Sequence, residues 1–221
     1  MWARIESNNI VEYYDRKQSI VLNNVRYSSQ IFTIWTDAQR KDLGIVPIVI
    51  SGSHLDTRFY IEHNHSDAIA GDGNSVIRTI GVKAADRALA DVNEVWTQSE
   101  IDGGQAPDGT SANDPKLDSD GNQIITRGLK YQAIQKVKAQ QAGLLLETDW
   151  YIIRKADVDT AIPSNIQTWR NAIRADATRI ETAITNAADM AAFIVLHTTT
   201  HKEDGTLDQL ATVASWTELG T

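Results

Sequence analysis

The feature that most constrains the fold is a seven-residue repeat of apolar side chains near the C-terminus. Its members are Ile166, Ile173, Ile180, Ala187 and Ile194. A strict spacing of seven is typical of a coiled-coil-like seam. A helix running from Pro163 to about His197 would be roughly 50 Å long, at about 1.5 Å per residue. An apolar seam of that length must be covered along its whole length, so it predicts a packed helical domain.

Two shorter helical segments precede this long helix. The first, GLKYQAIQKVKAQQAGLLLE at residues 128–147, has apolar residues three and four apart and predicts a helix of about 20 residues. The second, TDWYIIRKAD, places Thr148 as N-cap and Asp149 in the first turn, where a negative charge suits the helix dipole. The first helix can cover only part of the long one. The N-terminal region or a second copy must therefore supply the rest.

The first 35 residues predict short β-strands. Asn23-Asn24 lies between two β-branched runs, which indicates a hairpin turn. Residues 36–44 then predict a short capped helix, in which Thr36 is the N-cap, Gln39 completes a capping box and Gly44 stops the helix.

The apolar run IVPIVI that follows has the length of a strand. Pro47 cannot donate a backbone hydrogen bond, so we expect an edge strand or an irregular one. Further on, residues 98–123 are rich in Gly, Asp, Ser and Asn and nearly lack large apolar residues, which is typical of a linker or a long loop.

These elements predict an α+β protein: a small N-terminal β-rich domain followed by a long C-terminal α-helical hairpin with a coiled-coil-like seam. We place the β-rich module at 1–97, the linker or long loop at 98–123, the helical hairpin at 124–200 and a C-terminal tail at 201–221.

Charge and composition narrow the classes of function. The net charge is −8 and no basic stripe is present, which argues against binding to nucleic acid or to an anionic membrane surface. The absence of cysteine excludes disulfides and zinc–thiolate sites. No apolar run approaches the roughly 18 residues of a membrane span, and the N-terminus lacks a signal-peptide core. We therefore expect a soluble protein made in a cytoplasm.

One short stretch could bind a metal. In an extended chain His63 and His65 point to the same face, and histidines at this spacing can ligate a metal ion. A third ligand could come from Asp67, Asp72 or His54. Two surface histidines in a polar loop are the commoner case, so no cofactor is expected unless a metal binds at this pair.

Aromatic residues point instead to packing and interfaces. The chain has six tryptophans, of which most should lie in the core and one or two could lie in an interface. Trp150, at the junction between two predicted helices, is expected to be buried, so that its loss would cost about 3–5 kcal/mol.

The junction region resembles a phage protein family. The pattern LL-x-x-TDW-x-x-x-R, a short gap, IP and then WRNAIR resembles the C-terminal helical hairpin of tailed-phage tail-fibre assembly proteins and tail assembly chaperones. The matching positions are Leu144, Leu145, Thr148, Asp149, Trp150, Arg154, Ile162, Pro163, Trp169, Arg170 and Arg174. Trp169 stands where a tyrosine is more usual.

The N-terminus resembles the N-terminal module of small tail-fibre-region proteins of marine and freshwater phages. The matching positions are Ile31, Phe32, Trp35, Arg40, Gly44 and Ile45. The two resemblances together cover about residues 1–50 and 125–197, a little over half of the chain.

The resemblance implies a non-enzymatic structural component of a phage tail, associated with the baseplate or tail fibre, with an adaptor or host-attachment role. It would be made in the host cytoplasm, reside in the virion, bind other tail proteins and self-associate. The interaction and structural residues would be Trp35, Leu144, Trp150, Arg154, Trp169, Arg170, Ile173, Arg174 and Ile180. An alternative is a chaperone for fibre folding or trimerisation, and a remote one is a metal-dependent hydrolase using His63 and His65.

Overall fold

The computed structural model describes residues 1–220, which contain both strands and helices and an N-terminal sheet, confirming the α+β class. The chain divides into two compact units, Met1–Asp86 and Arg87–Thr221. This division falls before residue 97, where the sequence placed the end of the β-rich module, so strand-forming residues 87–97 belong to the second unit.

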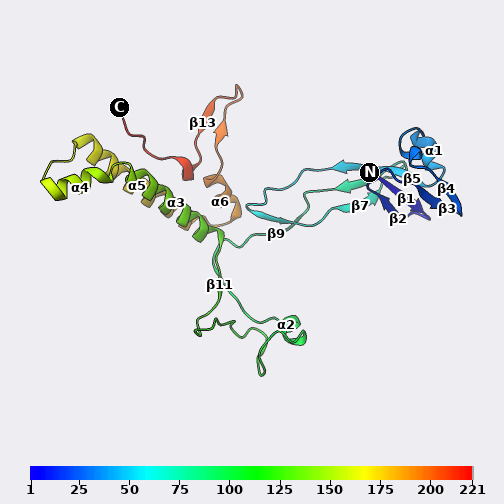
Figure 1. The fold of residues 1–221 in the computed structure, drawn as a ribbon, viewed down its shortest axis with the longest axis horizontal. Helices are drawn as coiled ribbons and strands as arrows, with labels where there is room; N and C mark the ends of the chain where they lie inside the picture. Colours follow the sequence, from blue (N-terminus) through cyan, green and yellow to red (C-terminus); the bar gives the residue numbers. More distant parts are fainter. Residues whose placement is uncertain (221) are drawn as a thin grey trace. The chain divides into compact units, whose positions relative to one another are not determined.

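A five-stranded sheet forms the centre of the first unit, with strand order β2-β1-β5-β8-β7 (Figure 1). Its strands are β1 (Trp2–Glu6), β2 (Asn9–Tyr14), β5 (Ile45–Ser51), β7 (Ser66–Ile69) and β8 (Val76–Thr79). Neighbouring strands are antiparallel except β5 and β8, which run parallel. A separate antiparallel pair joins β6 (Tyr60–Glu62) to β9 (Lys83–Asp86).

Two local sequence signals of this unit are confirmed, the Asn23-Asn24 turn and the capping box at Thr36, whereas the expectation of strands up to residue 35 is wrong, because Ser29–Phe32 form a 3₁₀ turn. Asn23 and Asn24, with φ of 48° and 61°, turn the chain between β3 (Ile20–Leu22) and β4 (Val25–Tyr27). After a 3₁₀ turn, η1 (Ser29–Phe32), the short helix α1 (Asp37–Lys41) begins with the predicted capping box. In that box the Gln39 amide N–H donates to the Thr36 hydroxyl, 3.3 Å away.

Two apolar clusters hold the sheet. The larger one joins the sheet to the β3–β4 hairpin and η1 through Tyr14, Phe32 and Ile45, with the Trp2 and Phe32 rings 4.8 Å apart. The smaller one consists of Ala3, Val46 and Val76. Burial of these side chains supplies the main stabilisation of the unit.

Of the two alternatives expected from Pro47, the edge strand is wrong, because β5 is the central strand of the sheet, and the irregular strand is the one observed. The reason is a change of partner along β5. Residues 45–47 pair with β1 and residues 48–51 pair with β8. Pro47 lies where the pairing passes from one neighbour to the other, so a missing N–H is tolerated there.

Residues 87–127 open the second unit, and residues 98–123 among them were predicted to be a linker or long loop. They contain the two-stranded pair β10 (Val92–Asn93) and β11 (Ile125–Thr126) and the helix α2 (Gln98–Asp102). Backbone hydrogen bonds connect distant parts of this segment, as from Glu94 N–H to Ile124 O and from Lys116 N–H to Glu94 O, both 2.9 Å. Yet none of residues 82–127 is buried.

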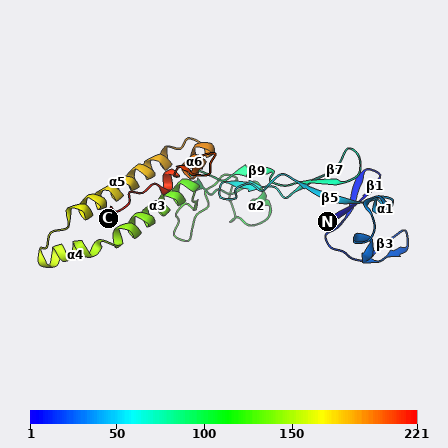
Figure 2. The same cartoon turned by 90° about the horizontal axis from the view of Figure 1, so that it is seen from above.

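Four helices follow, and α3 and α5 lie side by side in both ribbon views (Figures 1 and 2). They are α3 (Leu129–Leu146), α4 (Asp149–Val158), α5 (Ser164–Asn186) and α6 (Met190–Leu196). Helix α3 buries Ala133 and Val137, whereas α4 buries no residue.

The seven-residue repeat is buried through α5, where Ile166, Ile173 and Ile180 are all shielded from solvent. The expectation of one continuous helix to about His197 is wrong, because α5 ends at Asn186. Asp189 starts α6 by accepting a hydrogen bond from the Ala192 N–H at 2.8 Å, which is the action of an N-cap. Phe193, and not Ile194, is then buried.

The segment after α6, predicted to be a tail, returns along α5. It forms the β12 (Thr200–His201) and β13 (Leu207–Gln209) pair and the 3₁₀ turn η2 (Thr212–Ala214). The Trp169 Nε1–H then donates to Thr217 O at 3.0 Å, and Thr217 N–H donates to Asp176 Oδ2 at 2.8 Å. Within residues 1–220, no helix combines the length and the apolar character needed to span a membrane.

Candidate functional site

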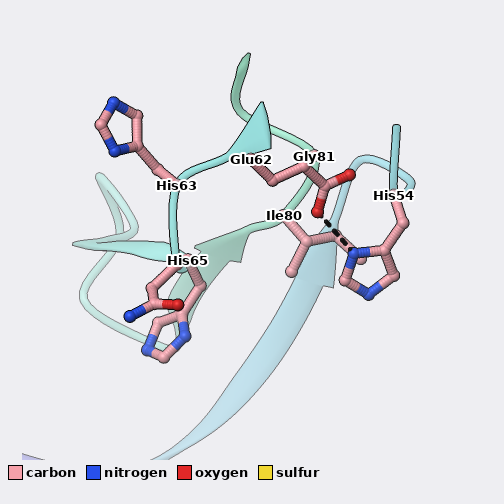
Figure 3. A pocket seen from close by; sticks show the side chains of 7 residues that line it. His54, Glu62, His63, His65, Ile80 and Gly81 are labelled. Atoms are coloured by element: carbon pink, nitrogen blue, oxygen red, sulfur yellow. Dashed lines mark hydrogen bonds and ion pairs between the residues drawn. The ribbon is translucent and has the colours of Figure 1, made fainter. Parts of the chain in front are cut away.

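One pocket of the first unit contains both histidines that the sequence singled out. It is about 280 Å³ in volume and is lined by His54, Glu62, His63, Asn64, His65, Ile80 and Gly81 (Figure 3). Residues 63–65 form the loop from β6 to β7, and His54 comes from the segment after β5. A loop anchored on strands thus presents the polar side chains.

Glu62 and His54 form the closest polar pair of this pocket. His54 Nδ1 lies 2.9 Å from Glu62 Oε2, and the Leu55 N–H donates to the other carboxylate oxygen. The hydrogen bond from His54 holds the pKa of Glu62 below its ordinary value. The carboxylate is therefore kept charged, and it is held in place by His54 and by the backbone of Leu55.

His63 and His65 do not converge in the same way. Their rings point apart in Figure 3. His65 Nε2 lies 3.7 Å from Asp67 Oδ2, and that carboxylate is itself held by Arg78 at 3.0 and 2.8 Å. No group of three His, Asp or Glu placed to hold a metal ion occurs in the described part of the chain. Metal binding at His63 and His65 stays a prediction.

A second polar site lies in the second unit where α3, α4 and α5 meet. Arg170 is buried there, and its Nη1 donates to Leu145 O at 2.8 Å and to Thr148 Oγ1 at 2.7 Å. Its Nη2 donates to Asp149 Oδ1 at 2.8 Å. One guanidinium thereby joins the end of α3 and the start of α4 to α5. We call these four residues the Arg170 junction.

The junction explains why one expectation fails. Thr148 precedes α4 but makes no cap hydrogen bond, because its hydroxyl donates to Leu145 O at 3.1 Å and accepts from Arg170. Arg170 is a buried structural cation, whereas Arg174, one turn later, is exposed.

Trp150 is not buried at the helix junction, contrary to expectation. The residue is 49% exposed and its ring stacks on Tyr151 with centroids 3.7 Å apart. The Arg154 guanidinium lies 4.8 Å from the Trp150 ring centroid, a cation–π contact. Together with the exposed Ile153, this makes an apolar and aromatic surface on α4.

The remaining predicted residues have packing roles. Trp35 packs edge-on against Tyr27, with centroids 5.9 Å apart, beside the larger cluster of the first unit. Trp169 is buried, and Leu144 is half-buried near the end of α3.

Sequence reasoning missed the apolar side chains displayed by residues 92–125. Val92, Val95, Leu117, Ile124 and Ile125 are all exposed there. The signal was present as short apolar pairs flanking the polar stretch, but the abundance of Gly and Asp between them predicted a loop. Comparisons with known protein families, with curated proteins and with solved structures find no match to this chain.

Proposed function

We propose that the chain is a non-enzymatic structural component of a tailed-phage tail, at the baseplate or tail fibre, with an adaptor or host-attachment role. The observation that carries the proposal is the segment of residues 82–127, which has a hydrogen-bonded backbone but no buried side chain. Ordering each residue costs roughly 1–2 kcal/mol of backbone entropy. Without a core of its own, such a segment is best stabilised by neighbouring proteins, as in an assembled particle.

The likeness to tail proteins supports this proposal through residues that have clear packing roles. Four of the matched positions, Leu145, Thr148, Asp149 and Arg170, form the Arg170 junction. Trp169 fixes the returning C-terminal segment to α5. The matched pattern therefore falls on the residues that set the geometry between helices.

We further propose that α3 and α5 act as a helical hairpin with a coiled-coil-like seam. Ile166, Ile173 and Ile180 supply the buried heptad positions of α5. The Lys130 ammonium donates to Thr185 O at 2.8 Å, which links the start of α3 to the end of α5. A hairpin of this kind would present α4 at its tip to other tail proteins.

Mass spectrometry of purified particles of the encoding phage tests the structural role. The expected result is this chain in mature particles at a fixed ratio to the other tail proteins. Its absence from mature particles would contradict the proposal. The alternative function, a chaperone for fibre assembly, would then be favoured.

The chaperone alternative has one observation in its favour, the unburied helix α4. Exposed Trp150 and Ile153 could cover apolar surface of an immature fibre and then release it. The test is expression of the fibre protein with and without this chain. Soluble trimeric fibre that forms only in its presence, with no chain left on the particle, would support the chaperone role.

The remote alternative is a metal-dependent hydrolase using His63 and His65, favoured by their place on the pocket that also contains His54 and Glu62. Elemental analysis of the purified chain tests it directly. Stoichiometric metal that is lost together with activity in the His63→Ala, His65→Ala variant would support it. A chain without stoichiometric metal after incubation with Fe²⁺, Mn²⁺ or Zn²⁺ would remove it.

A further inference from the structure

Asp-Gly pairs are the places where an aspartate side chain reacts most readily with its own backbone. The glycine has no side chain to hinder its nitrogen from attacking the preceding carboxyl group. The chain has five such pairs and no Asn-Gly pair, which would react in the same way. The pairs are Asp72-Gly73, Asp102-Gly103, Asp108-Gly109, Asp120-Gly121 and Asp204-Gly205.

In four of these pairs the glycine N–H already donates a backbone hydrogen bond. The donors and acceptors are Gly73 to Ala70 O at 2.8 Å, Gly103 to Ser99 O at 3.0 Å, Gly121 to Asp118 O at 3.1 Å and Gly205 to Lys202 O at 2.9 Å. Each nitrogen must give up its hydrogen bond and turn away from the acceptor before it can reach the aspartate side chain. The bond therefore slows the attack.

Gly109 takes a different position in its turn. Thr110 N–H donates to Pro107 O at 3.2 Å, so Asp108 and Gly109 are the two central residues. A φ of 83° at Gly109, the third residue of the turn, fits a type II turn. Within residues 1–220 the Gly109 N–H has no hydrogen-bond acceptor. Its nitrogen can therefore approach the side chain without breaking a bond.

The Asp108 side chain is equally unconstrained. The residue is exposed, and its carboxylate makes no hydrogen bond or ion pair within the part of the chain that the structure describes. No heavy atom lies within 4 Å of the place that a Cβ would take at Gly109. Both reacting groups are thus free, and they are neighbours in the same chain, which favours reaction between them.

Three of the other four carboxylates are held by hydrogen bonds. Asn74 N–H donates to Asp72 and Thr206 N–H to Asp204, both at 2.9 Å, and Gln98 Nε2 donates to Asp102 at 2.8 Å. The hydrogen bonds from Asn74 lower the pKa of Asp72, and those from Thr206, above all from its hydroxyl, lower the pKa of Asp204. A lowered pKa reduces the protonated form, which is the form that can lose its hydroxyl as water.

We propose that Asp108-Gly109 is a site of spontaneous succinimide formation and conversion to isoaspartate in the folded protein. The Gly109 nitrogen forms a bond to Asp108 Cγ, the Cγ–OH bond breaks, and the hydroxyl leaves as water with the proton of the Gly109 N–H. Water then adds to either carbonyl carbon of the cyclic imide. Opening at Cγ restores aspartate, whereas opening at the backbone carbonyl carbon gives isoaspartate, in which the backbone runs through Cβ and Cγ.

The modification changes the turn and leaves the rest of the second unit intact. Isoaspartate adds a methylene to the backbone between Pro107 and Thr110, so the hydrogen bond that closes the turn is lost. Within residues 1–220, Asp108 and Gly109 make no other hydrogen bond. The urea midpoint of the helical signal should therefore be the same before and after modification.

Incubation of the full chain in mildly acidic buffer, followed by mass spectrometry, tests the proposal. The tryptic peptides 59–78, 88–116, 117–127 and 203–221 contain all five pairs, and electron-transfer fragmentation assigns isoaspartate to each. Asp108 should convert about two- to tenfold faster than the other four, which is the change in rate that one hydrogen bond represents. Asp120 should come next, because only its glycine is held. Asp108→Glu should remove the Asp108 product and leave the other rates unchanged, since the longer side chain cyclises much more slowly.

The same incubation in urea separates the effect of the fold from that of the sequence. Unfolding releases every glycine N–H, so the five rates should converge. Equal rates at the five pairs in the folded protein would overturn the proposal. So would a preference for Asp108 that is as large in urea as in the folded protein, because it would come from the neighbouring residues in the sequence and not from the turn.

Discussion

Trp150 and Trp169 belong to neighbouring helices of the second unit but have opposite environments. Trp150 is half exposed, whereas Trp169 is buried and its indole N–H donates to Thr217 O. We expect Trp150→Ala to lower the free energy of unfolding by less than about 1 kcal/mol. Trp169→Ala should lower it by about 3–5 kcal/mol, because a large buried ring and its hydrogen bond are lost. Urea unfolding followed by circular dichroism at 222 nm measures the loss of unfolding free energy in both variants. Equal losses would contradict the exposure of Trp150 and the burial of Trp169.

Arg170 and Asp149 share an ion pair but differ in burial. Arg170 is only 4% exposed, and removing it leaves Thr148 Oγ1 without its donor and takes one of its donors from Leu145 O. We expect Arg170→Ala to cost about 2–4 kcal/mol of unfolding free energy. Asp149 is nearly half exposed, so Asp149→Asn should cost about 1 kcal/mol or less. The midpoints of urea unfolding test this order, and a larger loss for Asp149→Asn would show that the ion pair dominates the junction.

The environments of some single residues could not be predicted from the sequence. Arg170 and Arg174 are one helical turn apart and look alike in the sequence, yet one is buried and the other is exposed. The difference depends on where α3 ends, because Leu145 O must face α5 to accept from Arg170. That position is set by tertiary packing, which no local pattern records. His63 and His65 likewise required a loop conformation that their spacing alone could not predict.

Helix α3 depends on a close backbone contact at its first residues. Gly128 precedes α3, and a Cβ there would overlap the carbonyl oxygens of Leu89 and Ala90. The same stretch caps the helix, since Leu129 N–H donates to Ala88 O at 2.9 Å and Lys130 N–H to Leu89 O at 3.0 Å. Gly128→Ala should therefore lower the unfolding free energy by about 1–3 kcal/mol. Gly143→Ala, inside α3 with no atom within 4 Å of its added Cβ, is the control and should be neutral or stabilising.

The link between α2 and the sheet of residues 92–126 is sensitive to acid. The hydrogen bond from Lys116, aided by that of the Thr97 N–H, lowers the pKa of Glu100 to about 2. A carboxylate with a lowered pKa stabilises the folded state fully above its ordinary pKa, and that contribution is lost as pH falls towards the lowered value. We expect the ¹H–¹⁵N signals of Trp96, whose ring lies under Lys116, to shift between about pH 4.5 and 2. In Glu100→Gln the Trp96 signals should lose the part of their pH-dependent shift that comes from Glu100. If the pH dependence of these signals is the same in the variant, the ion pair of Glu100 with Lys116 does not connect α2 to the sheet.

At the scale of elements, the turns and helix starts that depend only on neighbouring residues could be predicted from the sequence. Asn23-Asn24 fixed a turn and Thr36 with Gln39 fixed a helix start, because each signal acts within four residues. The central place of β5 and the order in residues 98–123 could not be predicted. The first depends on a change of strand partner at Pro47, and the second on hydrogen bonds between positions about 30 apart, such as Glu94 and Ile124.

At the scale of the whole chain, burial is uneven. The sheet of the first unit and the helices α3 and α5 each enclose apolar side chains, whereas residues 82–127 enclose none. Stability follows buried apolar area, so the two ends should unfold as cooperative units while the middle opens at much lower free energy.

This uneven burial predicts where a protease cuts first. Trypsin should cut first at Lys116 or Arg127, because an open segment without a core is accessible to the protease. Arg174 should be cut much later, because cleavage there requires α5 to unfold. Gel analysis with mass identification of the fragments measures the order of the cuts, and cutting at Arg174 as fast as at Lys116 or Arg127 would show that the middle of the chain is as stable as the helices.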